Sequence, residues 1–220
     1  MFEKGLIYRD DRLVGWDCQL QTAISDVEIE YMDVPKPIQY AINGKKYPFG
    51  YLWNFKYPVV TGDLCKLSNE ELAKEFDEHP EKFTDFLMFG TTRPETMIGD
   101  SGIAIHPDDE RYKKYHNGFV YHPIRRCKIP IVCDAILVDM AFGTGVVKVT
   151  PAHDPNDFEV GKRHNLEFIN MLRDNGECLA PGTKFDHMPR LDARIEIIKF
   201  FTELNLYEGK TPNAMAIGLS

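Results

Sequence analysis

Short runs in which apolar and polar residues alternate dominate this chain, and they predict many short β-strands. We expect strands at 12–16, 27–30, 51–60, 85–90, 102–106, 129–133, 145–150 and 167–172. The pair Asn43-Gly44 lies between two alternating segments at 38–49 and favours a type I′ turn, so a β-hairpin is predicted there.

A few stretches carry helical patterns instead. Apolar residues recur at helical spacing over 190–204, and Ser68 with Glu71 forms a capping-box pattern that predicts an acidic helix over 68–76. Pro155 lies where a first helical residue belongs and predicts a helix at 155–164, and a helical turn is expected at 107–115. Many strands with few helices predict an α+β domain with a barrel-like, mostly antiparallel β core and flanking helices.

Polar residues gather where the predicted strand at 145–150 leads into the helix at 155–164. They are Lys148, Thr150, His153, Asp154 and Asp157. Lys148 and Thr150 alternate with valines, so we expect both on one face of the strand. A helix start offers free backbone N–H groups, so this junction suits a small polar ligand. The structural alternatives are an exposed lysine, Asp154 as an N-cap and Asp157 as the second half of a capping box.

A second polar cluster, Thr91-Thr-Arg-Pro-Glu-Thr-Met-Ile-Gly-Asp100, follows an apolar run at 86–89. Thr92 and Glu95 have the spacing of a capping box, and Pro94 is tolerated in a first helical turn. We therefore expect Glu95 to cap a helix rather than to act as a base.

These two clusters carry a resemblance to a known family. TTRPET at 91–96, followed about 50 residues later by GTGVVKVTPAHDPNDFEVGKRHN at 143–165, resembles the editing domain inserted in valyl-tRNA synthetases. Isoleucyl and leucyl enzymes carry a domain of the same kind. The isoleucyl type usually has TTTPWT, so Arg93 and Glu95 favour the valyl branch. Further matches at 5–16, 22–26 and 189–194 extend the resemblance over nearly the whole chain.

The resemblance implies a fold of the synthetase editing-domain type (Val/Ile/Leu). We expect the editing domain at 37–204, with 1–36 and 205–220 as connecting segments to an absent catalytic domain. The stretch 61–85 resembles an insertion, and a peripheral lid near the site is the alternative. No HIGH or KMSKS signature is present, so we expect an excised domain without aminoacylation activity, and ATP binding would belong to the parent protein.

The implied activity is post-transfer editing, the hydrolysis of the aminoacyl ester of mischarged Thr-tRNA(Val). Threonine has the shape of valine, and the valyl enzyme is itself the usual example of an apolar pocket that rejects such a hydroxyl only about a hundredfold. Two alternatives are an isoleucyl-type editing domain and a non-catalytic module that binds a tRNA end. Retention of the whole set of polar residues favours the hydrolase.

The resemblance also implies roles for single residues. Asp157 is expected to anchor the substrate α-ammonium, and Asp154 to contact that group or the threonine hydroxyl. Lys148 would donate to the hydroxyl or to the ester carbonyl, beside Thr150 on the pocket wall.

Further implied contacts come from the second cluster. Arg93 and Thr96 are expected to contact the phosphate of the terminal adenosine and the ester or the ammonium. Thr91 and Thr92 would donate backbone and hydroxyl groups to the developing oxyanion. His153 is counted with the substrate-binding residues, and for its side chain a structural hydrogen bond is the alternative to a general-base role. We expect a bound water as the nucleophile, with neither a covalent intermediate nor a metal.

Composition and net charge limit the classes of partner that the chain can bind. The net charge of −8 argues against a stand-alone nucleic-acid binder but allows a module that sees only the 3′ CCA end of tRNA(Val) carrying threonine. No apolar run of about 18 residues is present, so no membrane contact is expected. The five cysteines are scattered without a Cys-x-x-Cys pair, which predicts no zinc site and a reducing, cytoplasmic location. We expect a monomer without cofactors whose other partner is the remainder of the synthetase.

Overall fold

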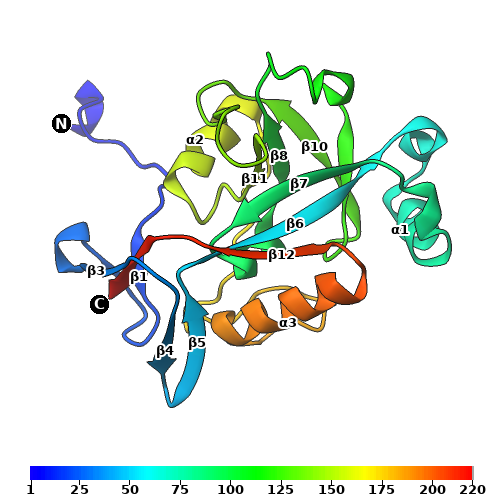
Figure 1. Cartoon of the computed structure of the whole chain (residues 1–220). Coiled ribbons are helices and arrows are strands. Elements are labelled where there is room, and N and C mark those ends of the chain that lie inside the picture. The colour runs from blue at the N-terminus through cyan, green and yellow to red at the C-terminus, as the bar shows by residue number, and fades with distance from the viewer. Residues whose placement is uncertain (220) are drawn as a thin grey trace.

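A seven-stranded sheet forms the centre of the molecule (Figure 1). A computed structural model describes residues 1–219, so Ser220, the end of the predicted C-terminal connecting segment, lies outside the described residues. The strands are β6 (Tyr51–Val60), β7 (Phe86–Thr91), β8 (Gly102–Ile105), β9 (Phe119–His122), β10 (Cys127–Cys133), β11 (Val146–Val149) and β12 (Tyr207–Pro212).

The sheet curls into a nearly closed barrel. Its order is β11-β8-β10-β9-β6-β12, and β7 also pairs with β6. All pairs are antiparallel except β8 with β10. The two strands β7 and β11 approach each other across the remaining opening, and both lead directly into the polar clusters. The barrel therefore brings together the two sequence motifs that lie about 50 residues apart.

Three two-stranded sheets lie on one side of the barrel (Figure 1). β1 (Gly15–Asp17) pairs with β2 (Thr22–Ile24), β3 (Glu30–Val34) with β13 (Met215–Leu219), and β4 (Ile38–Ile42) with β5 (Lys45–Phe49). The predicted Asn-Gly hairpin is confirmed, since Asn43 and Gly44 have φ of 50° and 78° between β4 and β5. Both termini lie on the same side of the barrel (Figure 1).

The helices are α1 (Asn69–Glu78), α2 (Pro155–His164) and α3 (Arg190–Glu203). Short 3₁₀ turns are η1 (Phe2–Lys4), η2 (Asp26–Glu28), η3 (Gly62–Lys66), η4 (Pro80–Lys82), η5 (Pro94–Gly99) and η6 (Lys113–Tyr115). The predicted capping box of α1 is confirmed, because Ser68 Oγ accepts from the Glu71 N–H and a Glu71 oxygen accepts from the Ser68 N–H. Among the described residues, no helix is long and apolar enough to span a bilayer.

The predicted strand at 167–172 is wrong. Only an isolated bridge between Leu172 and Cys178 forms there. The backbone N–H of Met171 donates to His153 Nε2 at 2.9 Å, and that of Leu172 donates to the Asn170 side chain at 3.2 Å. Side chains thus accept the backbone hydrogen bonds that the carbonyl groups of a neighbouring strand would accept in a sheet.

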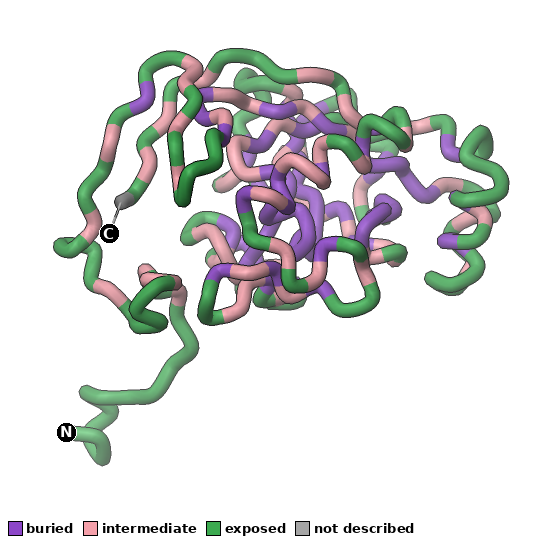
Figure 2. The backbone as a smooth tube through the Cα atoms, turned by 90° about the horizontal axis from the view of Figure 1, so that it is seen from below, coloured by how far each residue is buried: buried purple, intermediate pink, exposed green. Residues whose placement is uncertain are grey.

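Aromatic side chains fill the space between the barrel and α3. Phe55, Tyr57, Phe89 and Phe201 are fully buried, and Figure 2 shows the buried residues concentrated in the middle of the molecule. Phe55 meets Phe201 edge-on with ring centroids 5.3 Å apart. Each such side chain contributes about 1.5–3 kcal/mol by leaving water, so this packing holds β6, β7 and α3 as one unit.

An ion pair buried beneath η5 corrects the predicted role of Glu95. Arg93 rather than Thr92 is the N-cap of η5, and no side chain caps it. The Glu95 carboxylate instead accepts two hydrogen bonds of 2.8 Å from Arg194 on α3. Both side chains are almost completely buried, and although burial opposes it, Arg194 lowers the pKa of Glu95 to about 2. A buried carboxylate needs a cation, and Arg194 on α3 supplies it. Glu95 therefore forms an ion pair instead of the helix cap that the local sequence predicted.

We predict that Arg194→Met lowers the free energy of unfolding by about 3–5 kcal/mol, because the buried Glu95 charge would lose both hydrogen bonds from its cation and keep only Arg93, 3.9 Å away. Arg190→Met, on the exposed first turn of the same helix, should change it by less than about 0.5 kcal/mol. Urea titration measures both, and the double variant Arg194→Met/Glu95→Leu should recover most of the loss. A loss below about 1 kcal/mol for Arg194→Met would contradict this role.

Candidate functional site

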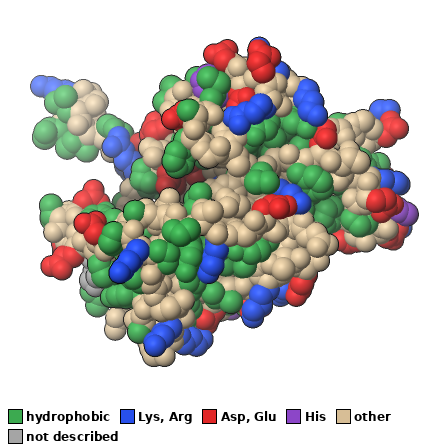
Figure 3. Space-filling view, in the orientation of Figure 1, with side chains coloured by type: hydrophobic (Ala, Val, Ile, Leu, Met, Phe, Trp, Pro, Cys, Tyr) green, Lys and Arg blue, Asp and Glu red, His purple; other side chains and the backbone are tan. Residues whose placement is uncertain are grey.

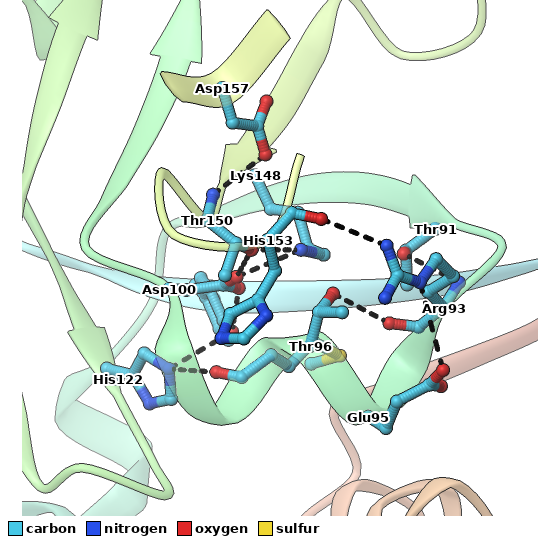
Figure 4. Close-up of polar contacts among 12 residues, drawn as sticks. Thr91, Arg93, Glu95, Thr96, Asp100, His122, Lys148, Thr150, His153 and Asp157 are labelled. Carbon is cyan, nitrogen blue, oxygen red and sulfur yellow. Dashed lines mark hydrogen bonds and ion pairs between the residues drawn. The ribbon is translucent and has the colours of Figure 1, made fainter. Parts of the chain in front are cut away.

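A cleft of about 290 Å³ opens between the end of β7, the strand β11 and the start of α2. All nine residues that the sequence pointed to line it: Thr91, Thr92, Arg93, Thr96, Lys148, Thr150, His153, Asp154 and Asp157. Leu52, Gly90, Leu137, Val147 and Asn156 complete the lining and were not predicted. Figure 4 shows the side chains from the two clusters facing each other.

The two aspartates at the start of α2 have different partners. Asp154 is the N-cap, and its Oδ1 accepts from the backbone N–H groups of Asn156 at 2.8 Å and Asp157 at 3.2 Å. Asp157 does not complete a capping box, because its Oδ2 accepts from the Thr150 N–H at 2.8 Å. No described residue hydrogen-bonds the other oxygen of either carboxylate, so each has an acceptor to spare.

The Asp157 carboxyl has an unusual pKa for an aspartate. Burial raises it to about 6, although the charge of Lys148 and the hydrogen bond from Thr150 oppose the rise. At neutral pH the group is therefore ionised at a cost, and a cation that entered the cleft would relieve that cost. Strongly shifted carboxyls in clefts often belong to functional sites.

A buried network forms the floor of the cleft. Lys148 Nζ donates to Asp100 Oδ1 at 3.0 Å and to Thr150 Oγ1 at 2.5 Å, and Thr150 Oγ1 donates to the same Asp100 oxygen at 2.6 Å. Lys148 is only 7% exposed, so the alternative of an exposed lysine is wrong. The predicted sharing of one strand face by Lys148 and Thr150 is confirmed.

Asp100 is the residue of this network that the sequence reasoning missed. It is fully buried, and its second oxygen accepts from the Tyr57 hydroxyl at 2.8 Å. Burial and the nearby Asp100 charge raise the Tyr57 pKa well above its usual value, so Tyr57 keeps its proton. Asp100 ends the polar cluster at 91–100 and is followed, after Ser101, by the fully buried strand β8, which is the local signal that could have indicated burial.

His153 is neutral, and its ring makes a structural hydrogen bond. Its Nε2 accepts from the Met171 N–H at 2.9 Å, and its carbonyl accepts from Arg93 Nη1 at 3.0 Å. Burial, helped by the charges of Arg93 and Lys148, lowers its pKa to about 4. Its Nε2 lone pair is occupied, so this nitrogen has no capacity to take a proton from a substrate.

The threonines before and within η5 shape the opposite wall. Thr91 Oγ1 accepts from the Arg93 N–H at 3.1 Å, and Thr96 Oγ1 donates to the Arg93 carbonyl at 2.8 Å. These bonds fix the turn that carries Arg93. The Arg93 side chain is 38% exposed at the rim, its Nε lies 3.9 Å from Glu95, and its guanidinium retains donors for an anion.

The cleft thus offers carboxylate oxygens at one end, a buried ammonium at its floor and an arginine at its rim. A small group that carries both an ammonium and a hydroxyl would match the first two, and a phosphate the third. Elsewhere, acidic and basic side chains are interspersed over the face shown in Figure 3, without a broad area of one sign.

Comparisons with known proteins agree with this geometry. The family described as tRNA synthetases class I (I, L, M and V) matches residues 1–200. A mitochondrial valine–tRNA ligase of Arabidopsis thaliana is 47% identical over 222 residues, which cover 100% of this chain and 18% of the relative. A valine–tRNA ligase of Trichomonas vaginalis is 44% identical over 100% of this chain and 42% of its own length. The chain thus spans less than half of each of these relatives.

One solved structure is similar in fold. The structure described as "The crystal structure of GlLeuRS-CP1" superposes with a TM-score of 0.52 and 14% identity, covering 71% of this chain and 96% of that one. Together with the nearly closed, mostly antiparallel barrel, this confirms the predicted α+β fold class.

We predict that Asp157→Asn stabilises the fold at pH 7 by about 1–3 kcal/mol, because the raised pKa of Asp157 makes its ionised form a burden on the native state. Asparagine can still accept the hydrogen bond from Thr150. The cost of ionising Asp157 in the folded state grows as pH rises from 3.8 to about 6 and is constant above that value. The stability gained by Asp157→Asn should therefore shrink as pH falls from about 6 to 3.8.

Urea titrations at pH 7 and pH 5 measure this difference. Glu159→Gln, an exposed carboxylate on the same helix, is the matched control and should change stability little at either pH. A variant that is less stable than wild type at pH 7 would contradict the prediction and show that the fold compensates the Asp157 charge.

Proposed function

Because the chain belongs to the class I tRNA synthetases of the isoleucine, leucine, methionine and valine group, we propose that it is the editing domain of a valine–tRNA ligase. Its proposed reaction is hydrolysis of the aminoacyl ester of Thr-tRNA(Val). The observation that carries the proposal is the Asp157 carboxylate, which has a free oxygen above a buried lysine in a cleft of about 290 Å³.

Asp157 and Asp154 suit the substrate's α-ammonium. A charge-assisted hydrogen bond in a partly closed cleft is about twice as strong as a neutral one. The free oxygen of Asp157 is ionised at pH 7 only at a cost, and the ammonium would remove that cost. Binding energy is therefore concentrated on a group that every aminoacyl ester carries, and selectivity must come from elsewhere.

The floor of the cleft supports a preference for threonine over valine. A γ-hydroxyl accepts from Lys148 and donates to the spare oxygen of Asp154, whereas the valine methyl does neither. Each buried polar group that valine leaves unpaired costs about 1–3 kcal/mol. This inverts the selectivity of an apolar pocket, which cannot reject the added hydroxyl.

Arg93 at the rim suits the phosphate of the terminal adenosine, so the ester would lie between the two walls. We propose that a water attacks the ester carbonyl, held by the aspartates and the neighbouring ribose hydroxyl. Thr91 and Thr92 lie on the wall where the oxyanion would develop. The engaged Nε2 of His153 agrees with a mechanism in which the histidine takes no proton there.

The proposed partners are the 3′ CCA end of tRNA(Val) and the remainder of the synthetase. A net charge of −8 and the mixed charges in Figure 3 fit a domain that receives the tRNA end from a body that binds the tRNA elsewhere. All five cysteines are unpaired, which fits the proposed reducing cytoplasmic location.

We predict that Asp157→Ala and Asp157→Asn abolish deacylation of Thr-tRNA(Val) without unfolding the chain, since both remove the ammonium anchor. For wild type, kcat/KM corrected for spontaneous hydrolysis should fall as pH drops through about 6, where Asp157 becomes protonated in the free protein. Glu159→Gln should retain activity and the same profile. Wild-type rates in either Asp157 variant would overturn the assignment.

We also predict that Lys148→Met, Thr150→Val and Asp154→Asn each reduce the preference for the threonyl over the valyl ester. At least one should change the ratio of the two kcat/KM values by roughly tenfold, or about 1.4 kcal/mol. Single-turnover deacylation of Thr-tRNA(Val) and Val-tRNA(Val) gives the ratio. If all three variants keep the wild-type ratio, the hydroxyl is recognised by other groups.

A further inference from the structure

We propose that Asp100 is the positioning residue that makes the floor of the cleft selective for a hydroxyl. This inference rests on the proposed function and deepens it. Asp100 is fully buried, does not line the cleft, and would act through Lys148 and Thr150, which do. Figure 4 shows these two side chains converging on it from above.

The first step concerns the hydroxyl of Thr150. A threonine hydroxyl has one proton to donate, and Thr150 gives it to Asp100 Oδ1 at 2.6 Å. It also accepts from Lys148 at 2.5 Å. Asp100 thus draws the only Thr150 proton away from the cleft, and Thr150 cannot donate to a substrate while this bond persists.

The second step concerns the ammonium of Lys148. It has three N–H donors, of which one goes to Asp100 and one to Thr150. No other described residue accepts from it, so the third donor remains for the cleft. The floor therefore presents one cationic donor and no competing hydroxyl proton. An oxygen at the γ-position of the substrate satisfies this floor, and a methyl leaves it unpaired.

The third step explains why the network keeps this direction. Tyr57 keeps its proton and donates it to Asp100 Oδ2 at 2.8 Å. The carboxylate is held from both sides and has no freedom to turn. If Asp100 lost its charge, the carboxylate left to attract Lys148 would be that of Asp157, which already interacts with the lysine. The ammonium of Lys148 would then compete with the substrate for its anchor.

The test compares Asp100→Asn with wild type in deacylation of Thr-tRNA(Val) and Val-tRNA(Val). We expect the ratio of the two kcat/KM values to fall at least tenfold. Asp109→Asn is the matched control, because Asp109 is also buried and paired, with Arg111, but lies outside the cleft. It should leave the ratio unchanged. A purely structural role for Asp100 would slow both esters equally and keep the ratio, which would overturn the inference.

The double variant Asp100→Asn/Lys148→Met closes the test. It removes both buried charges, so it also serves if Asp100→Asn alone does not fold. Because the donor that Asp100 positions is the Lys148 ammonium, the double variant should match Lys148→Met alone in selectivity to within about threefold. A further tenfold loss of selectivity would overturn the inference, since Asp100 would then act without this donor. If wild type hydrolyses neither ester, the proposed function itself fails, whereas loss of the Asp100 effect alone leaves it intact.

Discussion

The geometry of the whole cleft depends on one buried ion pair between a lysine and an aspartate. Lys148 and Asp100 are both buried, 3.0 Å apart, and neither is tolerable there without the other. The pair fixes where β11 lies against the chain segment after η5, and Thr150 and Tyr57 complete its hydrogen bonds. Each member is held by at least two polar contacts, so the floor is fixed, and one Lys148 N–H remains for the cleft. The acceptors left over belong to Asp154 and Asp157 at its edge.

The same logic explains the second buried pair. Glu95 and Arg194 connect η5 to α3 underneath the wall that carries Arg93. One pair thus supports each side of the cleft, and the aromatic core around Phe55 and Phe201 holds the strands between them. Asp157 differs from both, since its raised pKa shows that no cation in the fold fully compensates its charge. A fold that leaves one carboxylate poorly compensated gives up stability at the point where a ligand can supply the missing charge.

The sequence predicted local features more reliably than long-range ones. The Asn43-Gly44 hairpin, the α1 capping box and the start of α2 at Pro155 follow from interactions within a few residues, and all are confirmed. Glu95 was expected to cap a helix, and a capping box was the structural alternative for Asp157, but their partners Arg194 and Thr150 are reached only after folding. Asp100 was missed for the same reason: its role depends on a lysine 48 residues away. The nine predicted cleft residues came from two short motifs, and the barrel supplied the proximity that no local pattern specifies.

The central claim is that this cleft hydrolyses an aminoacyl ester and prefers the one that carries a hydroxyl. The most direct measurement is the rate at which the 220-residue chain deacylates Thr-tRNA(Val), beside Val-tRNA(Val) and Val-tRNA(Ile), at pH 7. We expect Thr-tRNA(Val) to be hydrolysed at least roughly tenfold faster than either valyl ester. Equal rates for the three substrates, faster loss of Val-tRNA(Ile), or no rate above spontaneous hydrolysis would contradict it.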